Sequence, residues 1–484
     1  MARVRVRDLY HYYQFITYIF MKKKLNYPNP MLGDPVSRNH LLDAWKRTRK
    51  DILSGSVPSK FNLYVHIPFC ICKCLFCMSV SFQTKDPVMV VSKYLDMLAD
   101  EIRQFSSVMN DIPVSAVYIG GGSPSILDAG QIGFLFNLLG SSFSITKDTR
   151  IIFEAFPQML DENKIDALKK SGISELALGV QSFDNEVLKA NRRPQVTEYV
   201  IKMHRYARRV GIPSITLDIM TGMPGQSISS AIETMGRAIS LNPDGILLNS
   251  FVPVDQSDFA LEGNIYTTDN MKQRDQATEE VQKMLQEAGY FSTDQGYRKE
   301  FTEYDKEHTY ETQECENILG LGWGAFSHAF GSLKYQKYNN AKDFLMDLKQ
   351  DGFFQDTDRN INAVIQGICE KADRTDCEYV GIEMNKSREM HSYVFTNIAH
   401  LNLREFKELF GESCADVFRT QFMLLNKLNI FRGYKMVSSN PADQQIAKTL
   451  FLDPEYIERM LTISREKYDP DYDYLPKLRS LLRR

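Results

Sequence analysis

The sequence predicts an α/β fold in which a parallel sheet curls into a barrel or partial barrel. From residue 61 onward, short runs rich in β-branched and aromatic residues alternate with longer segments of helical periodicity. Six such strand-then-helix units follow one another without a hairpin turn, so their strands should run parallel. We expect this barrel over residues 61–340, an N-terminal extension over residues 1–60 and a C-terminal helical module over residues 341–484.

Each strand-then-helix unit can be placed on the chain. The expected strands are residues 63–67, 116–120, 151–156, 175–180, 215–220 and 245–251. The helices that follow them are expected near residues 90–106, 126–139, 161–171, 195–210, 227–241 and 269–288. In the extension, residues 41–52 should form a helix. After the six units, the glycine-rich segment 320–327 is expected to close the fold, and His328 beside it to be a satisfied buried histidine rather than a ligand.

The C-terminal module is expected to be mostly helical. Two amphipathic segments, residues 402–410 and 415–428, precede a β-like run at residues 430–437. Two helices followed by a short β-like run are typical of a helix-turn-helix or winged module.

Composition and cysteine usage indicate a folded protein of a reducing cytoplasm. The 484 residues carry a formal net charge of -3, so no overall basic field points to nucleic acid or an anionic membrane. Four of the eight cysteines lie within residues 70–77 and the others are scattered, unlike a secreted disulfide framework. The aromatic run from Tyr10 to Phe20 is too short and interrupted to span a bilayer and lacks a signal-peptide cleavage site. We expect it to pack on the main domain, with a membrane-surface contact as the alternative.

Three cysteines lie on the loop that follows the first barrel strand. Cys70, Cys74 and Cys77 have the spacing Cys-x3-Cys-x2-Cys, and a loop can turn successive thiolates toward one soft-metal centre. Three thiolates suit a four-iron cluster with one iron left open for a ligand. Cys72 leaves a four-cysteine zinc knuckle as the alternative, although the distant second half-site of a zinc ribbon is missing.

Other unusual residues lie where later barrel strands end. The carboxyl ends of parallel strands gather at one face of a barrel, so residues far apart in sequence can meet there. Residues 120–125 read Gly-Gly-Gly-Ser-Pro-Ser. Because glycine has no side chain, a ligand should be able to approach this backbone and meet free N–H groups. Glu154, Gln181 and Asp218 lie on or after the next three strands. Alternatively, the glycines form an ordinary turn, and the polar residues only satisfy the hydrogen-bonding groups at the strand ends.

The segment Tyr64-Val-His-Ile-Pro-Phe-Cys70, followed by Cys74 and Cys77, resembles the signature of the radical S-adenosylmethionine (SAM) enzymes. The resemblance is to the branch of oxygen-independent coproporphyrinogen III oxidase and the related haem chaperone. It implies a six-stranded partial (β/α) barrel, in agreement with the strand count. It also implies a [4Fe-4S] cluster on the three cysteines, one or two molecules of SAM, and a reducing electron donor such as flavodoxin or ferredoxin. SAM cleaved by the reduced cluster would give a 5′-deoxyadenosyl radical that abstracts hydrogen from the substrate.

The same resemblance implies roles for individual residues. Gly121, Gly122 and Ser123 would hold the amino-acid end of SAM, and Tyr64 would lie against SAM near the cluster. The remaining polar contacts to SAM would be Glu154, Gln181, Arg193 and Asp218, with Arg192 a neighbour of the same type as Arg193. Phe76 would shield the cluster from water. The alternative, of equal weight, is that Phe76 is an ordinary aromatic residue of the hydrophobic core.

Departures from the relatives' patterns bear on the substrate. Ser79 stands where the oxidase pattern has a fourth cysteine, and the oxidase's N-terminal Pro-Arg-Tyr-Thr-Ser-Tyr-Pro segment is missing. The stretch from His308 lacks the haem-associated residues of the chaperone. We therefore predict a radical enzyme that acts on a tetrapyrrole or other aromatic small molecule, with radical methyl transfer or a related modification preferred. Coproporphyrinogen decarboxylation and a haem-binding chaperone are the alternatives, and nucleic-acid binding through the basic residues 477–484 is the weakest one.

Overall fold

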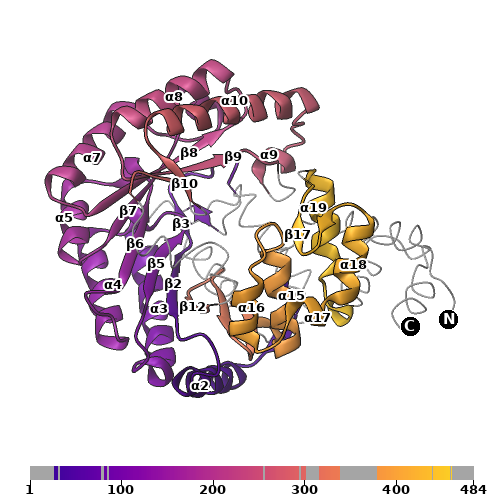
Figure 1. The fold of residues 1–484 in the computed structure, drawn as a ribbon. Helices are drawn as coiled ribbons and strands as arrows, with labels where there is room; N and C mark the ends of the chain where they lie inside the picture. Colours follow the sequence, from indigo (N-terminus) through magenta and orange to yellow (C-terminus); the bar gives the residue numbers. More distant parts are fainter. Residues whose placement is uncertain are drawn as a thin grey trace.

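The computed structural model describes residues 27–30, 33–77, 81–83, 87–253, 257–293, 296–300, 316–337, 379–438, 440–457 and 459. The largest sheet in this part of the chain has 13 strands and curves into an arc. Helices cover the convex side of the arc, and the C-terminal helices lie across its open side (Figure 1).

Six neighbouring strands of this sheet are parallel, as the sequence predicts. In order across the sheet they are β2 (Phe61–Ile67), β5 (Ala116–Gly121), β6 (Arg150–Ala155), β7 (Glu175–Gln181), β8 (Ser214–Thr221) and β9 (Gly245–Ser250). All five pairings between them are parallel. The partial (β/α) barrel expected from the sequence is therefore confirmed.

A helix follows each of these strands on the convex side. These helices are α3 (Pro87–Met109), α4 (Ala129–Ser142), α5 (Glu162–Lys170), α7 (Thr197–Arg209), α8 (Ile228–Ser240) and α10 (Thr268–Glu287). Polar N-caps fix several of their starts: the Asp128 side chain accepts a hydrogen bond from the backbone N–H of Gln131, and Ser227 accepts one from Ser230. Short helical turns not expected from the sequence are α6 (Asn185–Ala190), α9 (Asp258–Leu261), η2 (Pro124–Ile126) and η3 (Pro157–Met159).

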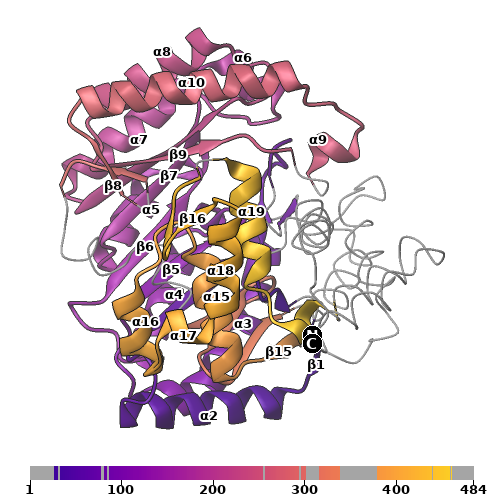
Figure 2. The ribbon, with the colours of Figure 1, turned by 45° about the vertical axis from the view of Figure 1, so that its right-hand side comes forward.

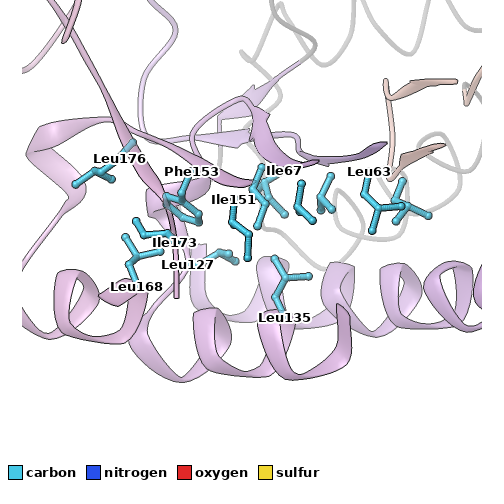
Figure 3. Packing of buried hydrophobic residues seen from close by; sticks show 14 of the residues in the cluster. Leu63, Ile67, Leu127, Leu135, Ile151, Phe153, Leu168, Ile173 and Leu176 are labelled. Carbon is cyan, nitrogen blue, oxygen red and sulfur yellow. The ribbon is translucent and has the colours of Figure 1, made fainter. Parts of the chain in front are cut away.

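The main core lies between the convex face of the sheet and these helices. Leu63 and Ile67 of β2 and Phe153 of β6 point toward the helices, where Leu135 and Leu168 meet them (Figure 3). Burying a side chain of this size stabilises the fold by about 1.5–3 kcal/mol. Because side chains alternate along a strand, Tyr64 and its neighbours at every second position face the concave side instead.

The sheet continues beyond both ends of the six parallel strands. Next to β2 lies β12 (Asn317–Leu321), which is parallel to it, followed by the antiparallel strands β13 (Phe326–Ala329), β14 (Leu333–Lys337), β15 (Tyr379–Glu383) and β1 (Asp34–Val36). Beyond β9 lie β11 (Gly296–Arg298) and β10 (Phe291–Thr293). The glycine-rich segment 320–327 thus forms the β12–β13 connection beside β2, and among the described strands it does not join β9 to close the ring.

The C-terminal part forms a second, smaller core on the open side of the arc (Figure 2). Its elements are α15 (Lys386–Thr396), α16 (Leu403–Phe410), α17 (Cys414–Val417), α18 (Arg419–Lys427), the hairpin β16 (Phe431–Arg432) with β17 (Lys435–Met436), and α19 (Pro441–Leu450). The expected helix over residues 415–428 is interrupted at Phe418, whose ring is buried against Phe406 and Phe451. Helices followed by a short hairpin match the winged-type module expected from the sequence.

Residues of the N-terminal extension contact both hydrophobic cores. Its helix α2 (Arg38–Ser54) contains the expected residues 41–52, and the Trp45 indole donates a hydrogen bond to the Tyr335 hydroxyl at 2.7 Å. Ahead of it, β1 pairs with β15. Tyr27 lies in the C-terminal core, where its hydroxyl donates to Asp453 at 2.6 Å and Arg388 donates to the same carboxylate.

Several sequence predictions concern residues outside the described ranges. These are the aromatic run from Tyr10 to Phe20, Ser79, the stretch from His308 and the basic residues 477–484. The domain division at residues 60 and 340 stays a prediction. In the described part of the chain, no helix combines the length and apolar character needed to cross a bilayer.

A buried ion cluster at the amino ends of the barrel strands generates a stability prediction. Glu175 is buried, accepts a hydrogen bond from Thr216 at 2.6 Å, and is paired with Arg298 at 3.1 Å and with Arg150. Burial alone would raise the pKa of its carboxyl, but the two arginines hold that pKa below its ordinary value. Its contribution to stability is therefore present above the unfolded carboxyl pKa of about 4 and is lost as pH falls through the lower folded pKa.

We expect Glu175→Gln to lower the free energy of unfolding at pH 7 by about 3–5 kcal/mol, because it leaves two buried guanidinium groups without their anion. Urea unfolding followed by circular dichroism measures this change. The control is Glu233→Gln, which removes an exposed pair with Arg237 and should cost below about 0.5 kcal/mol. Equal losses in the two variants would contradict the prediction.

Candidate functional site

The loop that carries the cysteines leaves β2 at the carboxyl end of the barrel and is held by three other segments. The backbone N–H groups of Gly122 and Ser123 donate to the carbonyls of Ile67 and Phe69 at 2.8 and 2.9 Å. Farther along the loop, Leu75 donates to the carbonyl of Asn191 and accepts from the N–H of Phe259, at 3.2 and 3.1 Å. The loop position is thus fixed from the barrel and from the segments after β7 and β9.

The three predicted ligand cysteines lie together on this loop. Cys74 is buried, while Cys70 and Cys77 are half-buried. Burial, together with the neighbouring Cys77 and Cys74, raises the pKa of Cys70 to about 12. The thiols of Cys74 and Cys77 are thus close enough to Cys70 to act on its pKa.

The spacing of the thiols bears on the zinc alternative. Among the described residues, no three Cys, His, Asp or Glu side chains are close enough to hold one metal ion. A structural zinc needs four ligands on one ion, at about 2.0–2.3 Å each. A four-iron cluster takes its thiolates on different irons and needs no such convergence. This spacing of the thiols is compatible with a cluster on three cysteines.

Cys72, the fourth cysteine of the zinc-knuckle alternative, contacts Cys74. A hydrogen bond from Cys72 lowers the pKa of the Cys74 thiol, the charge of Arg193 lowers it further, and burial opposes both. The same contact raises the pKa of Cys72. Cys74 is therefore the better thiolate of this pair.

The glycine loop after β5 corrects one expectation. The sequence predicted N–H groups free to meet a ligand, but those of Gly122 and Ser123 bind the cysteine strand and that of Gly121 donates to Glu154 at 3.3 Å. The glycines serve close packing instead. A Cβ atom at Gly121 would lie 2.8 Å from the His66 ring, and one at Gly122 would lie 2.8 Å from the Phe69 carbonyl oxygen.

Two carboxyl groups predicted at the site face the concave side. Glu154 accepts hydrogen bonds from the Tyr118 hydroxyl and from Gly121, and burial raises its pKa. Burial and the nearby Glu154 and Glu175 raise the pKa of Asp218 to about 8. Within the described residues, burial and charges account for this shift, and no hydrogen bond to the Asp218 carboxyl contributes to it.

Gln181 lies at the end of β7 in a backbone conformation that is rare outside glycine, with a φ of 68°. Its side-chain Oε1 is buried and has no hydrogen-bond partner among the described residues. Leaving a buried acceptor unsatisfied costs about 1–3 kcal/mol, which a bound donor would recover. An ammonium or hydroxyl group of a cofactor could donate to this oxygen.

The structure distinguishes the two adjacent arginines. Arg193 is buried, and its Nη1 lies 3.6 Å from the Cys74 Sγ. Arg192 has a φ of 58° and points to the surface, where it pairs with Glu262 at 2.7 Å. Arg193 thus lies beside the cysteine loop, and Arg192 lies at the surface.

Aromatic side chains complete the concave face. The Tyr64 hydroxyl lies 2.8 Å from His66 Nδ1, and its ring contacts Tyr118 and Phe326 at centroid distances of 6.0 and 5.8 Å. Tyr118 and Phe326 are 36% and 43% exposed, although both lie on this inner face. Neither was predicted, but the alternation of β5 places Tyr118 on the concave side. Phe76 is half-buried and packs beside a small cluster that contains Leu75, Phe251 and Phe259.

The side chains present fit an iron–sulfur cluster and SAM. Three thiols are gathered on one anchored loop, and a buried cation lies beside one of them. Asp218 and the Gln181 Oε1 offer acceptors, and Arg193 offers donors, that suit the ammonium, ribose and carboxylate groups of SAM.

Comparisons with known proteins agree with this arrangement. The family model described as "Radical SAM superfamily" matches residues 64–238. The oxygen-independent coproporphyrinogen III oxidase of Salmonella typhimurium is 30% identical over 330 residues, which cover 65% of this chain and 69% of the oxidase. The heme chaperone HemW of Buchnera aphidicola from Acyrthosiphon pisum is 32% identical over 185 residues, which cover 38% of this chain and 49% of the chaperone.

A solved structure supports the fold over nearly the whole chain. The structure of coproporphyrinogen III oxidase (HemN) from Escherichia coli, described as a radical SAM enzyme, superposes with a TM-score of 0.69 and 21% identity. The superposition covers 88% of this chain and 96% of that one. The chain therefore belongs to the radical SAM superfamily, whose cofactors are a [4Fe-4S] cluster and SAM, in the branch of oxygen-independent coproporphyrinogen III oxidase and the haem chaperone HemW.

Proposed function

We propose that this protein is a radical SAM enzyme that abstracts hydrogen from a tetrapyrrole, in an oxidase-type reaction. The observation that carries the proposal is the 30% identity over 69% of a coproporphyrinogen III oxidase. Radical methyl transfer, which the sequence analysis preferred, gains no support from these relatives, which are oxidases and chaperones. We therefore treat it as one outcome of the test below.

Each side chain of the site has a proposed task. Cys70, Cys74 and Cys77 would hold the cluster, with Phe76 shielding it from water. Glu154, Gln181 and Asp218 would accept hydrogen bonds from SAM, Arg193 would meet its carboxylate, and Tyr64 would lie against it. Because the N–H groups of Gly121, Gly122 and Ser123 are occupied, this loop would meet the SAM ammonium through carbonyl oxygens. When bound, the cluster and SAM together supply a one-electron cleavage and a hydrogen-abstracting radical.

The concave face also suggests the class of substrate. Tyr118 and Phe326 expose aromatic surface beside Tyr64, on the same face as the two carboxyl groups. Aromatic rings stack favourably against flat ligands and add about 0.5–1.5 kcal/mol beyond the buried area. A tetrapyrrole has the required flat, largely apolar body. An acidic flavodoxin or ferredoxin is the proposed electron donor, in a reducing cytoplasm that suits an oxygen-sensitive cluster.

The second candidate is a haem chaperone, because HemW is 32% identical over 185 residues of this chain. That match spans only 49% of the chaperone. The chaperone is therefore an alternative outcome of the same experiment.

The test is anaerobic product analysis of the reconstituted protein with SAM, dithionite and single tetrapyrroles, coproporphyrinogen III first. We expect 5′-deoxyadenosine to rise several-fold with the true substrate, together with an oxidised or decarboxylated product seen by mass spectrometry. The control is protein with Cys70→Ala, which should give neither product.

Other products would overturn the oxidase-type proposal. A methylated tetrapyrrole with S-adenosylhomocysteine would show methyl transfer. Stoichiometric haem binding without 5′-deoxyadenosine above the substrate-free level would show a chaperone.

Cysteine variants test which thiols hold the cluster. We expect Cys70→Ala, Cys74→Ala and Cys77→Ala each to lose most of the bound iron and the cluster absorbance, because the cluster then has only two protein ligands. Cys72→Ala and Cys414→Ala, which change a neighbouring thiol and a thiol of the C-terminal core, should retain iron. Iron loss in Cys72→Ala with retention in Cys74→Ala would reverse the assignment.

The raised pKa of Asp218 predicts a pH dependence of SAM binding. Only the ionised carboxylate attracts the cationic SAM, and in the free protein ionisation occurs near pH 8. We expect SAM affinity, measured by equilibrium dialysis, to increase between pH 6 and pH 8 by up to about tenfold per pH unit. Asp218→Asn should flatten this profile, whereas Asp166→Asn on the outer helix α5 should not. A flat profile in the unaltered protein would contradict the prediction.

A further inference from the structure

Arg193 is a buried cation whose position is fixed by the protein around it. Its exposed fraction is 9%, and its guanidinium carbon lies 4.2 Å above the centre of the Phe156 ring. Nε donates to the Gln195 Oε1 at 3.2 Å, and Nη2 donates to the carbonyl of Gly179. Gln195 is itself held, because its amide donates to the Val180 carbonyl at 2.8 Å. The guanidinium therefore has little freedom to turn away.

The remaining side of the guanidinium faces the cysteine loop. Nη1 lies 3.6 Å from the Cys74 Sγ, within hydrogen-bond range for sulfur. Within the described residues, no carboxylate forms an ion pair with Arg193. An arginine stays charged in proteins, and a buried guanidinium favours negative groups near it, among them the Asp218 carboxyl, whose pKa Arg193 lowers. The site is thus built for a negative group beside Cys74.

On the proposed function, that negative group is the thiolate-ligated cluster. We infer that Arg193 is a positioning residue that donates a hydrogen bond to the Cys74 sulfur of the bound cluster and raises the reduction potential of the cluster. A nearby cation and a hydrogen bond to a ligating sulfur both stabilise the more negative, reduced state. The added electron comes from an external one-electron reductant, and Arg193 neither gains nor loses a proton.

This role differs from a contact with SAM alone. A contact with the SAM carboxylate acts only when SAM is bound, whereas the contact with Cys74 acts on the cluster by itself. A reduction potential measured without SAM therefore isolates the proposed effect.

The neighbouring Arg192 provides a matched control. It carries the same charge one position earlier, but it is exposed and pairs with Glu262 at 2.7 Å. Water screens the charge of Arg192, and Glu262 compensates it. The effect of Arg192 on the reduction potential of the cluster should therefore be small.

The experiment is an anaerobic potentiometric titration of the reconstituted protein without SAM, with dithionite as reductant and the reduced cluster followed by electron paramagnetic resonance. We expect Arg193→Gln to shift the midpoint potential to more negative values, because it removes the cation and weakens the hydrogen bond. Arg193→Lys should give a smaller shift, and Arg192→Gln should match the unaltered protein.

The outcomes separate this inference from the proposed function. An unchanged potential in Arg193→Gln, with normal iron content, would overturn the inference and leave the enzyme proposal intact. An unaltered protein that takes up no cluster would overturn the enzyme proposal itself. If Arg193→Gln fails to retain iron, the inference is tested instead on the unaltered protein labelled with ¹⁵N-arginine, by electron paramagnetic resonance. Its reduced cluster should show magnetic coupling to a labelled nitrogen, and the absence of this coupling would overturn the inference.

Discussion

The alternation of side chains along the six parallel strands is the constraint on which the rest of the structure depends. In β2, Leu63 and Val65 are buried against the helices, and Tyr64 between them faces the concave side. The same alternation sends Phe153 outward and Glu154 inward on β6. Because the convex face holds the main hydrophobic core, the concave face is free to carry aromatic and ionisable groups. The stability of the fold and the chemistry of the site therefore occupy opposite faces of one sheet.

The glycine loop and the cysteine loop are bound to each other, and this contact organises the site. Gly121 and Gly122 allow the loop after β5 to approach His66 and Phe69 at distances that no side chain would permit. The N–H groups that might have met a ligand are used to hold the cysteine strand in place. The N–H donors of this loop therefore fix the position of the thiols. On the proposed function, the carbonyl oxygens of the loop and the side chains of Glu154, Gln181, Asp218 and Arg193 meet the cofactor.

The barrel could be predicted from the sequence because each strand and each helix carries its own periodicity. The antiparallel strands β13 to β15 were missed, since they are short and β15 pairs with a strand far away in sequence. Most of the predicted site residues could be proposed together because they lie on or just after neighbouring parallel strands, which the topology brings to one face. Arg192 and Arg193 could not be told apart, because only the left-handed backbone at Arg192 turns one outward and the other inward. The occupied N–H groups were also beyond prediction, since their partners belong to another strand.

The buried cluster around Tyr27 has a consequence for the order of events on the ribosome. Tyr27 is bonded to Asp453, 426 positions later in the chain, and β1 pairs with β15. Every parallel strand of the barrel emerges before these partners do, so the barrel can assemble early, whereas the segment around Tyr27 must wait for almost the whole chain to be synthesised. Contacts of such long range are slow to form. The first described residues are thus among the last to reach their native place, and translation that stops before residue 453 leaves them without it.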